Sequence, residues 1–294
     1  MNAMSPNAIG SLYMVLGSLA YVLNDAFVRS ATEDGLNVYQ VICLRGVVMA
    51  VLFGAVGMAR GEGIQKSHLQ RPFLSRVAAE MIATSFFFGA LVRMDFANAQ
   101  AILQIVPFAI TLAAVFVLGE RVSSRRYVTI AIGFIGVLIV VRPATEGFNA
   151  WSLFVVASVV AMVARELATR RVDPATPALS VAFATAVGNT LLGGAISLNS
   201  GWGALQSKGL VMIGLASALL FFGYLFTIET VRIGDLSVSA PFRYTVLLGA
   251  VVFGYIFFDE VPDAPTIIGS TVIVAAGLYA ISLDRAQSPQ PLRR

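Results

Sequence analysis

The feature of this sequence that most constrains its fold is a long stretch that occurs twice. The first copy, residues 98–141, is an apolar run that ends near Glu120, a short basic turn and a second apolar run. The second copy, residues 238–283, is an apolar run that ends near Glu260, a short turn containing proline and another apolar run. Self-similarity at a fixed offset is typical of a chain built from repeats.

Further landmarks recur at nearly the same offset. Asp235 follows Asp95 by the same number of positions as Glu260 follows Glu120, and the pair Arg165-Glu166 resembles Asn24-Asp25 at an offset only one position longer. These landmarks predict two homologous halves. We place the halves at residues 8–141 and 150–283 and expect a cytoplasmic tail at 284–294.

The composition indicates the class of protein. Of the 294 residues, 57% are hydrophobic and only 12% are charged, whereas soluble domains carry about 25% charged residues. A soluble protein of this size would lack enough polar side chains for its surface, so we expect a multi-pass membrane protein. The net charge of +4 therefore does not indicate a nucleic-acid partner, and the single cysteine, Cys43, excludes an intrachain disulfide.

The apolar runs are long enough to cross a membrane, which requires about 20 residues. Ten runs qualify, near residues 8–28, 37–59, 73–92, 96–118, 125–141, 150–169, 178–198, 209–231, 236–258 and 265–283. The expected fold is an all-α integral membrane protein of ten transmembrane helices. Pro107 and Pro241 lie inside two of these runs, where proline removes a hydrogen bond and bends the helix.

The distribution of basic residues predicts the orientation, because cytoplasmic loops carry more Lys and Arg. With a cytoplasmic N-terminus, thirteen basic residues lie in inside loops and only Arg29, Arg93, Arg142 and Lys208 lie in outside loops. Both termini are therefore predicted to be cytoplasmic. Five helices per half would then insert the halves in opposite directions, as an inverted-topology repeat, and such repeats are the usual basis of alternating access in secondary transporters.

Two motifs and their repeats carry a resemblance to a known family. They are Gly119-Glu120-Arg-Val-Ser with Gly136-Val-Leu-Ile-Val-Val-Arg-Pro143, and Asp259-Glu260-Val-Pro with Gly277-Leu-Tyr. Together with the ten runs, they make the chain similar to the EamA-type members of the drug/metabolite transporter superfamily. The segment Arg-Glu-Leu-Ala-Thr-Arg-Arg at 165–171 also looks like a feature of one bacterial branch.

The resemblance implies a carrier of small polar or amphipathic metabolites in the bacterial inner membrane, with members that export amino acids and others that import metabolites or vitamins. It implies a cavity between the halves, on the first, third, fourth, sixth, eighth and ninth helices. No P-loop is present, so we expect no cofactor; coupling to protons, exchange with a counter-substrate and uncoupled transport all remain open. Monomer and homodimer are both compatible with the sequence.

The strongest candidates for substrate binding lie on the fourth and ninth runs. Arg243 and Tyr244 follow Pro241, and Gln100 and Gln104 occupy the symmetry-related run one turn apart. We expect these four side chains to converge, which would suit a carboxylate or a zwitterion because guanidinium binds carboxylate bidentately. The alternative is a structural hydrogen-bond network.

Ionisable groups in the other runs are candidates for coupling or gating, because a lipid-facing charge costs about 2.5–3.5 kcal/mol. Asn24 and Asp25 in the first run and Arg165 and Glu166 in the sixth could line the cavity from symmetry-related positions. The alternative is that the acids pair locally with Arg29 and Arg170 four residues on.

Arg45 could neutralise Asp25 or form another inter-helix ion pair, and Tyr224 could line the cavity. Glu80 could pair with Arg76, and Glu229 with Arg232, each within its own helix. Pro107 and Pro241 would serve as gating hinges. We expect Glu120 and Glu260 to have a structural role, either capping the following helix or fixing a turn.

The predicted function is a secondary transporter, with export favoured over import. An enzyme is disfavoured because the sequence has no His-Glu-x-x-His, no Gly-x-Ser-x-Gly and no acidic cluster, so we also expect no metal site. A channel is disfavoured because pores are usually built from symmetric subunits, whereas this chain carries its own internal pair.

Overall fold

The computed structural model describes residues 5–62, 69–120, 122–143, 145 and 148–287. Within these residues, ten helices are long and apolar enough to cross a membrane, which confirms the predicted all-α fold with ten spans. Many large apolar side chains, such as Phe116 and Leu198, are exposed on the outside of the bundle. Such a surface is compatible with lipid.

The helices follow the predicted order. The first half comprises α1 (Pro6–Glu33), α2 (Val38–Ala59), α3 (Arg71–Leu91), α4 (Phe96–Leu103), α5 (Val106–Leu118) and α6 (Ser124–Val141). The second half comprises α7 (Trp151–Thr169), α8 (Ala178–Ser200), α9 (Ser207–Ile233), α10 (Leu236–Ser239), the 3₁₀ helix η2 (Ala240–Tyr244), α11 (Thr245–Phe258) and α12 (Ala264–Gln287). Residues 288–294 of the expected tail lie outside the described residues.

The two spans that contain an internal proline were predicted to bend, and each is divided into separate helices. Pro107 lies at the start of α5, and the α4 helix ends just before it at Leu103. Pro241 lies in η2, between the single turn of α10 and the longer α11. Proline has no backbone N–H and its ring clashes with the carbonyl four residues earlier, so each span continues in a new helix.

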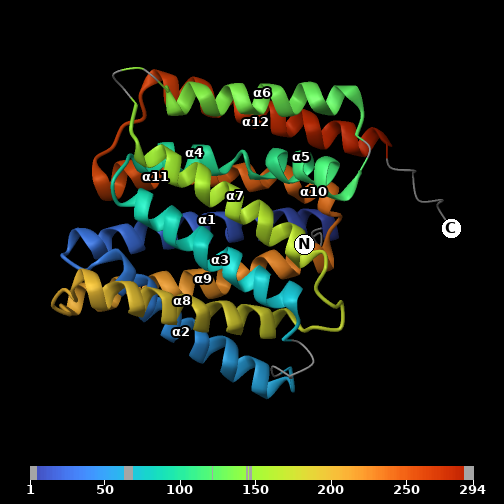
Figure 1. Ribbon diagram of the computed structural model, residues 1–294. Helices are drawn as coiled ribbons and strands as arrows, with labels where there is room; N and C mark the ends of the chain where they lie inside the picture. The colour runs from blue at the N-terminus through green and yellow to red at the C-terminus, as the bar shows by residue number, and fades with distance from the viewer. Residues whose placement is uncertain (1–4, 63–68, 121, 144, 146–147, 288–294) are drawn as a thin grey trace.

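The helices pack in pairs that join the two halves. In Figure 1, α6 lies beside α12 along one edge of the bundle, and α2 lies beside α8 along the opposite edge. Between them, α1 packs on α9, and α3 packs on α7. If α1, α2, α3 and α6 correspond to α7, α8, α9 and α12, exchanging the halves turns the α1–α9 pair into the α7–α3 pair. The α2–α8 and α6–α12 pairs are unchanged by the exchange, as a two-fold repeat predicts. The opposite membrane orientation of the halves stays a prediction.

Small residues allow the edge pairs to approach closely. A Cβ atom added to Gly193 in α8 would lie 2.7 Å from the Tyr39 carbonyl oxygen and 2.8 Å from the Cys43 nitrogen in α2. In the α6–α12 pair, a Cβ atom on Gly136 would lie 3.0 Å from the Gly269 carbonyl oxygen. Small residues at helix interfaces are the usual means of tight packing in membranes.

The two ends of the bundle are named here after residues. At the Thr169 end, α1 and α3 begin, and α7 and α12 end; at the Arg29 end, α1 ends and α12 begins (Figure 1). Arg29 was expected in an outside loop, but it lies inside α1, which continues to Glu33. The basic-residue bias predicts that the Thr169 end is cytoplasmic.

Candidate functional site

A cavity of about 470 Å³ lies between the two halves. Ligand pockets for small molecules typically measure about 300–1,000 Å³. Its lining comes from α1 (Tyr21, Asn24, Asp25), α2 (Ile42, Arg45, Gly46, Met49, Phe53), α3 (Arg76, Glu80, Thr84, Phe87, Phe88), α4 (Leu103), α7 (Met162, Arg165, Glu166, Thr169), α8 (Ala182, Thr185, Ala186, Asn189) and α9 (Leu220, Tyr224, Thr227). The resemblance also implied residues from the ninth span, which corresponds to η2 and α11. That span contributes none of the lining residues, whereas α2 and α8, which were not expected, do.

A buried polar network closes one end of this central cavity. The Asp25 carboxylate accepts hydrogen bonds from Asn24 Nδ2 at 2.8 Å and from Gln100 Nε2 at 2.7 Å. Arg45 Nη1 donates to Asn24 Oδ1 at 3.1 Å, and its guanidinium lies over the Phe88 ring at 4.6 Å from the centroid. The alternative of a local pair between Asp25 and Arg29 is not formed, because the Arg29 guanidinium pairs with Glu260 instead.

A second set of charged groups lies on α3 and α7. Arg165 Nη1 is 2.9 Å from a carboxylate oxygen of Glu80, and Arg165 Nη2 is 4.0 Å from Glu166. The possible local pair between Arg76 and Glu80 is not formed, since Glu80 pairs with Arg165 and Arg76 Nη1 donates to Thr185 Oγ1 at 2.7 Å. The Arg165–Glu80 and Arg76–Thr185 contacts both join one half of the chain to the other.

Aromatic side chains form much of the remaining lining. Tyr224 lies edge-on to Phe53 with ring centroids 5.2 Å apart, and its hydroxyl donates to the Ala178 carbonyl oxygen at 3.2 Å. The Tyr21 hydroxyl accepts a hydrogen bond from Thr227 at 3.3 Å. Charged groups beside aromatic rings suit a ligand with both polar and apolar parts.

The central cavity extends toward one end of the bundle only. Its lining includes Thr169, the last residue of α7, and Ala182, near the start of α8. Toward the Arg29 end the lining stops at Asp25 on α1, and Ala26, Val28 and Phe96 are fully buried. The cavity therefore has a closed end in this conformation.

The comparison with protein families identifies the first half of the chain. The family described as the EamA-like transporter family matches residues 8–142. Residues 8–142 form an EamA-like transporter domain.

The relatives of this chain are named after several different substrates. It is 24% identical to an S-adenosylmethionine uptake transporter of Rickettsia prowazekii over 73% of this chain and 74% of that protein. It is 24% identical to a riboflavin transporter of Rhizobium johnstonii, over 96% of this chain and 94% of the relative. It is also 24% identical to the pseudopaline exporter CntI of Pseudomonas aeruginosa, over 95% and 96%. These names indicate transporters rather than enzymes.

One solved structure, described as "Crystal structure of protein", has the same fold. It superposes with a TM-score of 0.65 and covers 98% of this transporter and 100% of its own chain, at 19% sequence identity.

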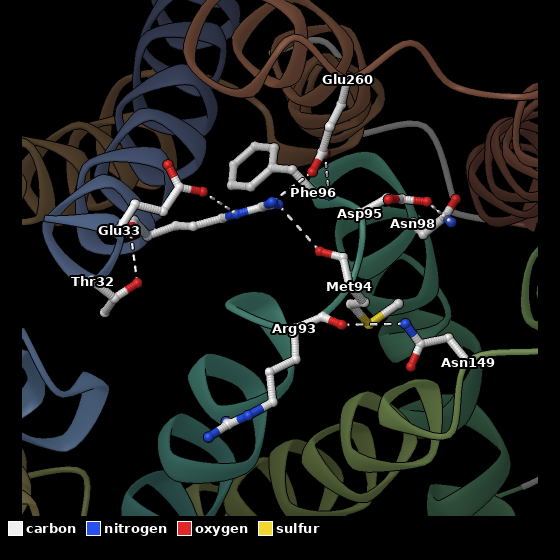
Figure 2. A network of polar contacts seen from close by, with 10 residues as sticks. Thr32, Glu33, Arg93, Met94, Asp95, Phe96, Asn98, Asn149 and Glu260 are labelled. Atoms are coloured by element: carbon white, nitrogen blue, oxygen red, sulfur yellow. Dashed lines mark hydrogen bonds and ion pairs between the residues drawn. The ribbon is translucent and has the colours of Figure 1, made fainter. Parts of the chain in front are cut away.

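The closed end of the transporter is held by an ion pair between the halves. Arg29 Nη2 on α1 lies 2.5 Å from Glu260 Oε1 in the link between α11 and α12. Arg29 Nη1 also donates to the Met94 carbonyl oxygen at 3.1 Å, and the other carboxylate oxygen of Glu260 accepts the Phe96 N–H at 2.7 Å. Figure 2 shows how Glu260, Met94 and Phe96 meet at this point.

Asn149, between the two halves, also contacts the link between α3 and α4. Asn149 Nδ2, just before α7, donates to the Arg93 carbonyl oxygen at 3.2 Å (Figure 2). The link between α3 and α4 is thus fixed by Glu260 of the second half and by Asn149, which directly precedes that half. Of the two structural roles expected for Glu260, capping of its own following helix is not observed, because its carboxylate binds the N-terminus of α4 instead.

The matching glutamate of the first half also forms an ion pair. Arg170 Nη1, just after α7, lies 2.5 Å from Glu120 Oε1 in the link between α5 and α6. Gly119 and Asp259, the residues before the two glutamates, both have left-handed backbone conformations, with φ of 69° and 53°. Each glutamate therefore follows the same kind of sharp turn.

The side chains of Arg243 and Tyr244 lie elsewhere. They line a second cavity of about 180 Å³, together with Pro107, Arg126 and other residues of α5, α6 and α12. Gln100 instead binds Asp25, and Gln104 is buried at the end of α4. The expected convergence of these four side chains on one cavity is therefore not observed.

Glu229 lies outside both cavities. It forms the expected local pair with Arg232, at 3.4 Å.

Several polar lining residues of the central cavity were not predicted to line it. Thr84, Thr185 and Asn189 were not considered, and Arg76 and Glu80 were considered only as a local pair; all five lie on α3 or α8. Their positions inside apolar runs are the one sequence signal that could have found them, since polar groups in membrane spans usually face protein or water.

Proposed function

We propose that this protein is a secondary transporter that moves a small zwitterionic or amphipathic metabolite across the bacterial inner membrane by alternating access. The observation that supports the proposal is a cavity between the halves that carries acids and bases and ends within the protein. A carrier needs such a site at the interface of its two repeats. The match of residues 8–142 to the EamA-like transporter family supports the same function.

The central cavity suggests how a zwitterion would bind. Arg45 is buried and makes its hydrogen bond to a neutral amide, Asn24, so its remaining donors are available to a carboxylate. Asp25 lies beside it and would attract a cationic group. Phe88 and Tyr224 would contact apolar parts of the substrate. Gln100 would hold the Asp25 carboxylate in position.

We further propose that Glu166 and Asp25 are the groups to test for coupling to protons, with exchange for a counter-substrate as the alternative. Both acids line the central cavity, whereas Glu229 does not. Arg243, Tyr244 and Gln104 remain a second candidate set, acting during the conformational change beside Pro107 and Pro241. A pH gradient across proteoliposomes that leaves the transport rate unchanged would exclude proton coupling.

Export is the direction that we favour. With both termini cytoplasmic, the Thr169 end faces the cytoplasm and the central cavity would load from that side. Import is the alternative, since relatives include an uptake transporter as well as an exporter.

A thermal-shift screen of the purified protein in detergent tests the proposal. A ligand at about 100 times its Kd stabilises the folded state by about 2.7 kcal/mol, which is readily measured. Amino acids, nucleoside-like compounds and vitamins should be screened at two pH values, and hits then tested for saturable transport in proteoliposomes. Single-channel currents, or hits that show no saturable transport, would contradict the proposal.

A further inference from the structure

The two inter-half ion pairs occupy equivalent positions in the repeat. Arg170 follows Arg29 at the offset that relates Glu166 to Asp25, and Glu260 follows Glu120 at an offset only one position shorter. The first pair joins α1 of the first half to the second half, and the second joins the end of α7 to the first half. They lie at opposite ends of the bundle.

The surroundings of the two pairs differ. The side chains of Arg29 and Glu260 are 13% and 19% exposed, whereas those of Arg170 and Glu120 are 41% and 49% exposed. Arg29 also stacks over the Phe258 ring at 4.2 Å. Among the described residues, the hydrogen bonds and ion pairs of the Arg170 and Glu120 side chains are only with each other.

The buried Arg29–Glu260 pair therefore binds a further backbone segment, whereas the exposed Arg170–Glu120 pair does not. That segment is the link at Met94 and Phe96, where α4 begins. The offset that relates Glu120 to Glu260 places the equivalent positions of the second half at Gly234 and Leu236, where α10 begins. The backbone of this second link is held instead by Asn7 Oδ1, which accepts the Asp235 N–H at 2.9 Å.

We propose that the two ion pairs are alternating gates that exchange these contacts. When the Thr169 end closes, the Glu120 carboxylate accepts the Leu236 N–H and Arg170 donates to the Gly234 carbonyl oxygen. Glu260 then releases the Phe96 N–H, and the Arg29 end opens. The Glu260 carboxylate binds an N–H group at the N-terminus of α4, where the helix dipole favours a negative charge. The Leu236 N–H, at the single turn of α10, would form a charge-assisted hydrogen bond only. Each contact therefore stabilises one conformation.

The proposal rests on the alternating access proposed above, but its test measures conformation and not transport. In a Cys43→Ser background, one reporter cysteine replaces Ala182, which lines the central cavity toward the Thr169 end. The other replaces Ala26, which is fully buried below Arg29. Maleimide labelling rates are measured in detergent, where both ends are accessible. The reporter at 182 should label fast, and the reporter at 26 slowly.

Removing a gate charge should shift the two rates in opposite directions. Glu260→Gln should raise the labelling rate of the reporter at 26 relative to that at 182 by on the order of tenfold, the factor expected for losing a hydrogen bond to a charged group. Glu120→Gln should lower the same ratio, because the contact with the Leu236 N–H belongs to the other conformation alone, whereas the exposed pair with Arg170 is present in this one as well. The double exchange Arg29→Glu with Glu260→Arg can restore the ion pair but not the hydrogen bonds to Met94 and Phe96, so the ratio should stay raised.

A matched control is available at the Arg29 end. Asp34 pairs with Lys208 at 2.6 Å and joins the same two halves, but Ala175 occupies the equivalent repeat position. Asp34→Asn should therefore leave the ratio unchanged.

Three outcomes would overturn the proposal. They are an equal shift in Asp34→Asn, an unchanged ratio in Glu260→Gln, and shifts of the same sign in both glutamate variants. If Glu260→Gln fails to fold, Glu120→Gln at its exposed pair still decides the sign. Loss of the ratio shifts with intact saturable transport would reject the gates and retain the transporter.

Discussion

The Asp25 carboxylate accepts a 2.7 Å hydrogen bond from Gln100 and so joins α1 to α4 at the closed end of the central cavity. The same carboxylate is bonded to Asn24, which in turn binds Arg45. One acid and one base are thereby held beside each other through the Asn24 amide. A zwitterion could pair with both groups.

The first prediction concerns Asp25. Asp25→Asn keeps a hydrogen-bond acceptor for Gln100 but removes the charge, and should reduce transport of a zwitterionic substrate at least about tenfold, as expected for one charge-assisted bond. Glu229→Gln is the matched control, because Glu229 pairs with Arg232 and does not line the cavity. Equal transport by both variants in proteoliposomes would remove Asp25 from the site.

The second prediction separates the two cavities. Arg243 lines the smaller one, so Arg243→Ala should retain the thermal shift produced by substrate, whereas Arg45→Gln should lose most of it. Transport by Arg243→Ala should nevertheless be slowed, if the small cavity changes shape during the cycle. Loss of the ligand-induced shift in Arg243→Ala, with Arg45→Gln unaffected, would move the substrate to the smaller cavity.

A third prediction concerns the α2–α8 edge pair. Gly193→Ala should lower Tm, because its new Cβ would meet backbone atoms of Tyr39 and Cys43, and overpacking typically costs about 1–3 kcal/mol. Gly214→Ala is the control, since a Cβ at that position meets nothing within 4 Å. Its Tm should stay the same or rise slightly, because alanine favours the helix. Equal Tm values for the two variants would show that the edge pair is not tightly packed in solution.

The fourth prediction is a pH dependence at the start of α12. Burial alone would raise the pKa of Asp263, but hydrogen bonds from Thr266 and the pair with Arg142 at 2.5 Å outweigh it, so the net shift of the pKa is downward. A folded pKa below the unfolded value of about 3.9 gives stability that is present above that pH and lost as the pH falls through the folded pKa. Asp263→Asn should therefore lower Tm slightly at pH 7, and the difference from wild type should vanish at low pH. A difference that is constant from pH 7 to pH 3 would argue against the pair.

The sequence predicted the periodic and local features of this fold well. The ten spans follow from apolar length, and the breaks in two of them follow from Pro107 and Pro241, because proline acts on its own helix. The pair between Glu229 and Arg232 is likewise local. Such features depend on residues within one or two helical turns.

The partners of the charged residues depended on packing between distant spans. Arg29 lies four residues from Asp25 but binds Glu260, which is 231 residues away. Arg165 binds Glu80 and Arg76 binds Thr185 for the same reason. Helical spacing makes a local pair possible, but only the relative rotation of the helices decides which face each side chain takes. The repeat offset alone could have suggested the relation between the two ion pairs.

The closed end of the central cavity has an electrical consequence. Among the described residues, fully buried side chains and an ion pair separate the Asp25 network from the Arg29 end, which would block a path for ions in this conformation. A cell can therefore hold many copies of the protein without ions leaking through it and dissipating the gradients across the membrane. That insulation lasts only while the two ends never open together.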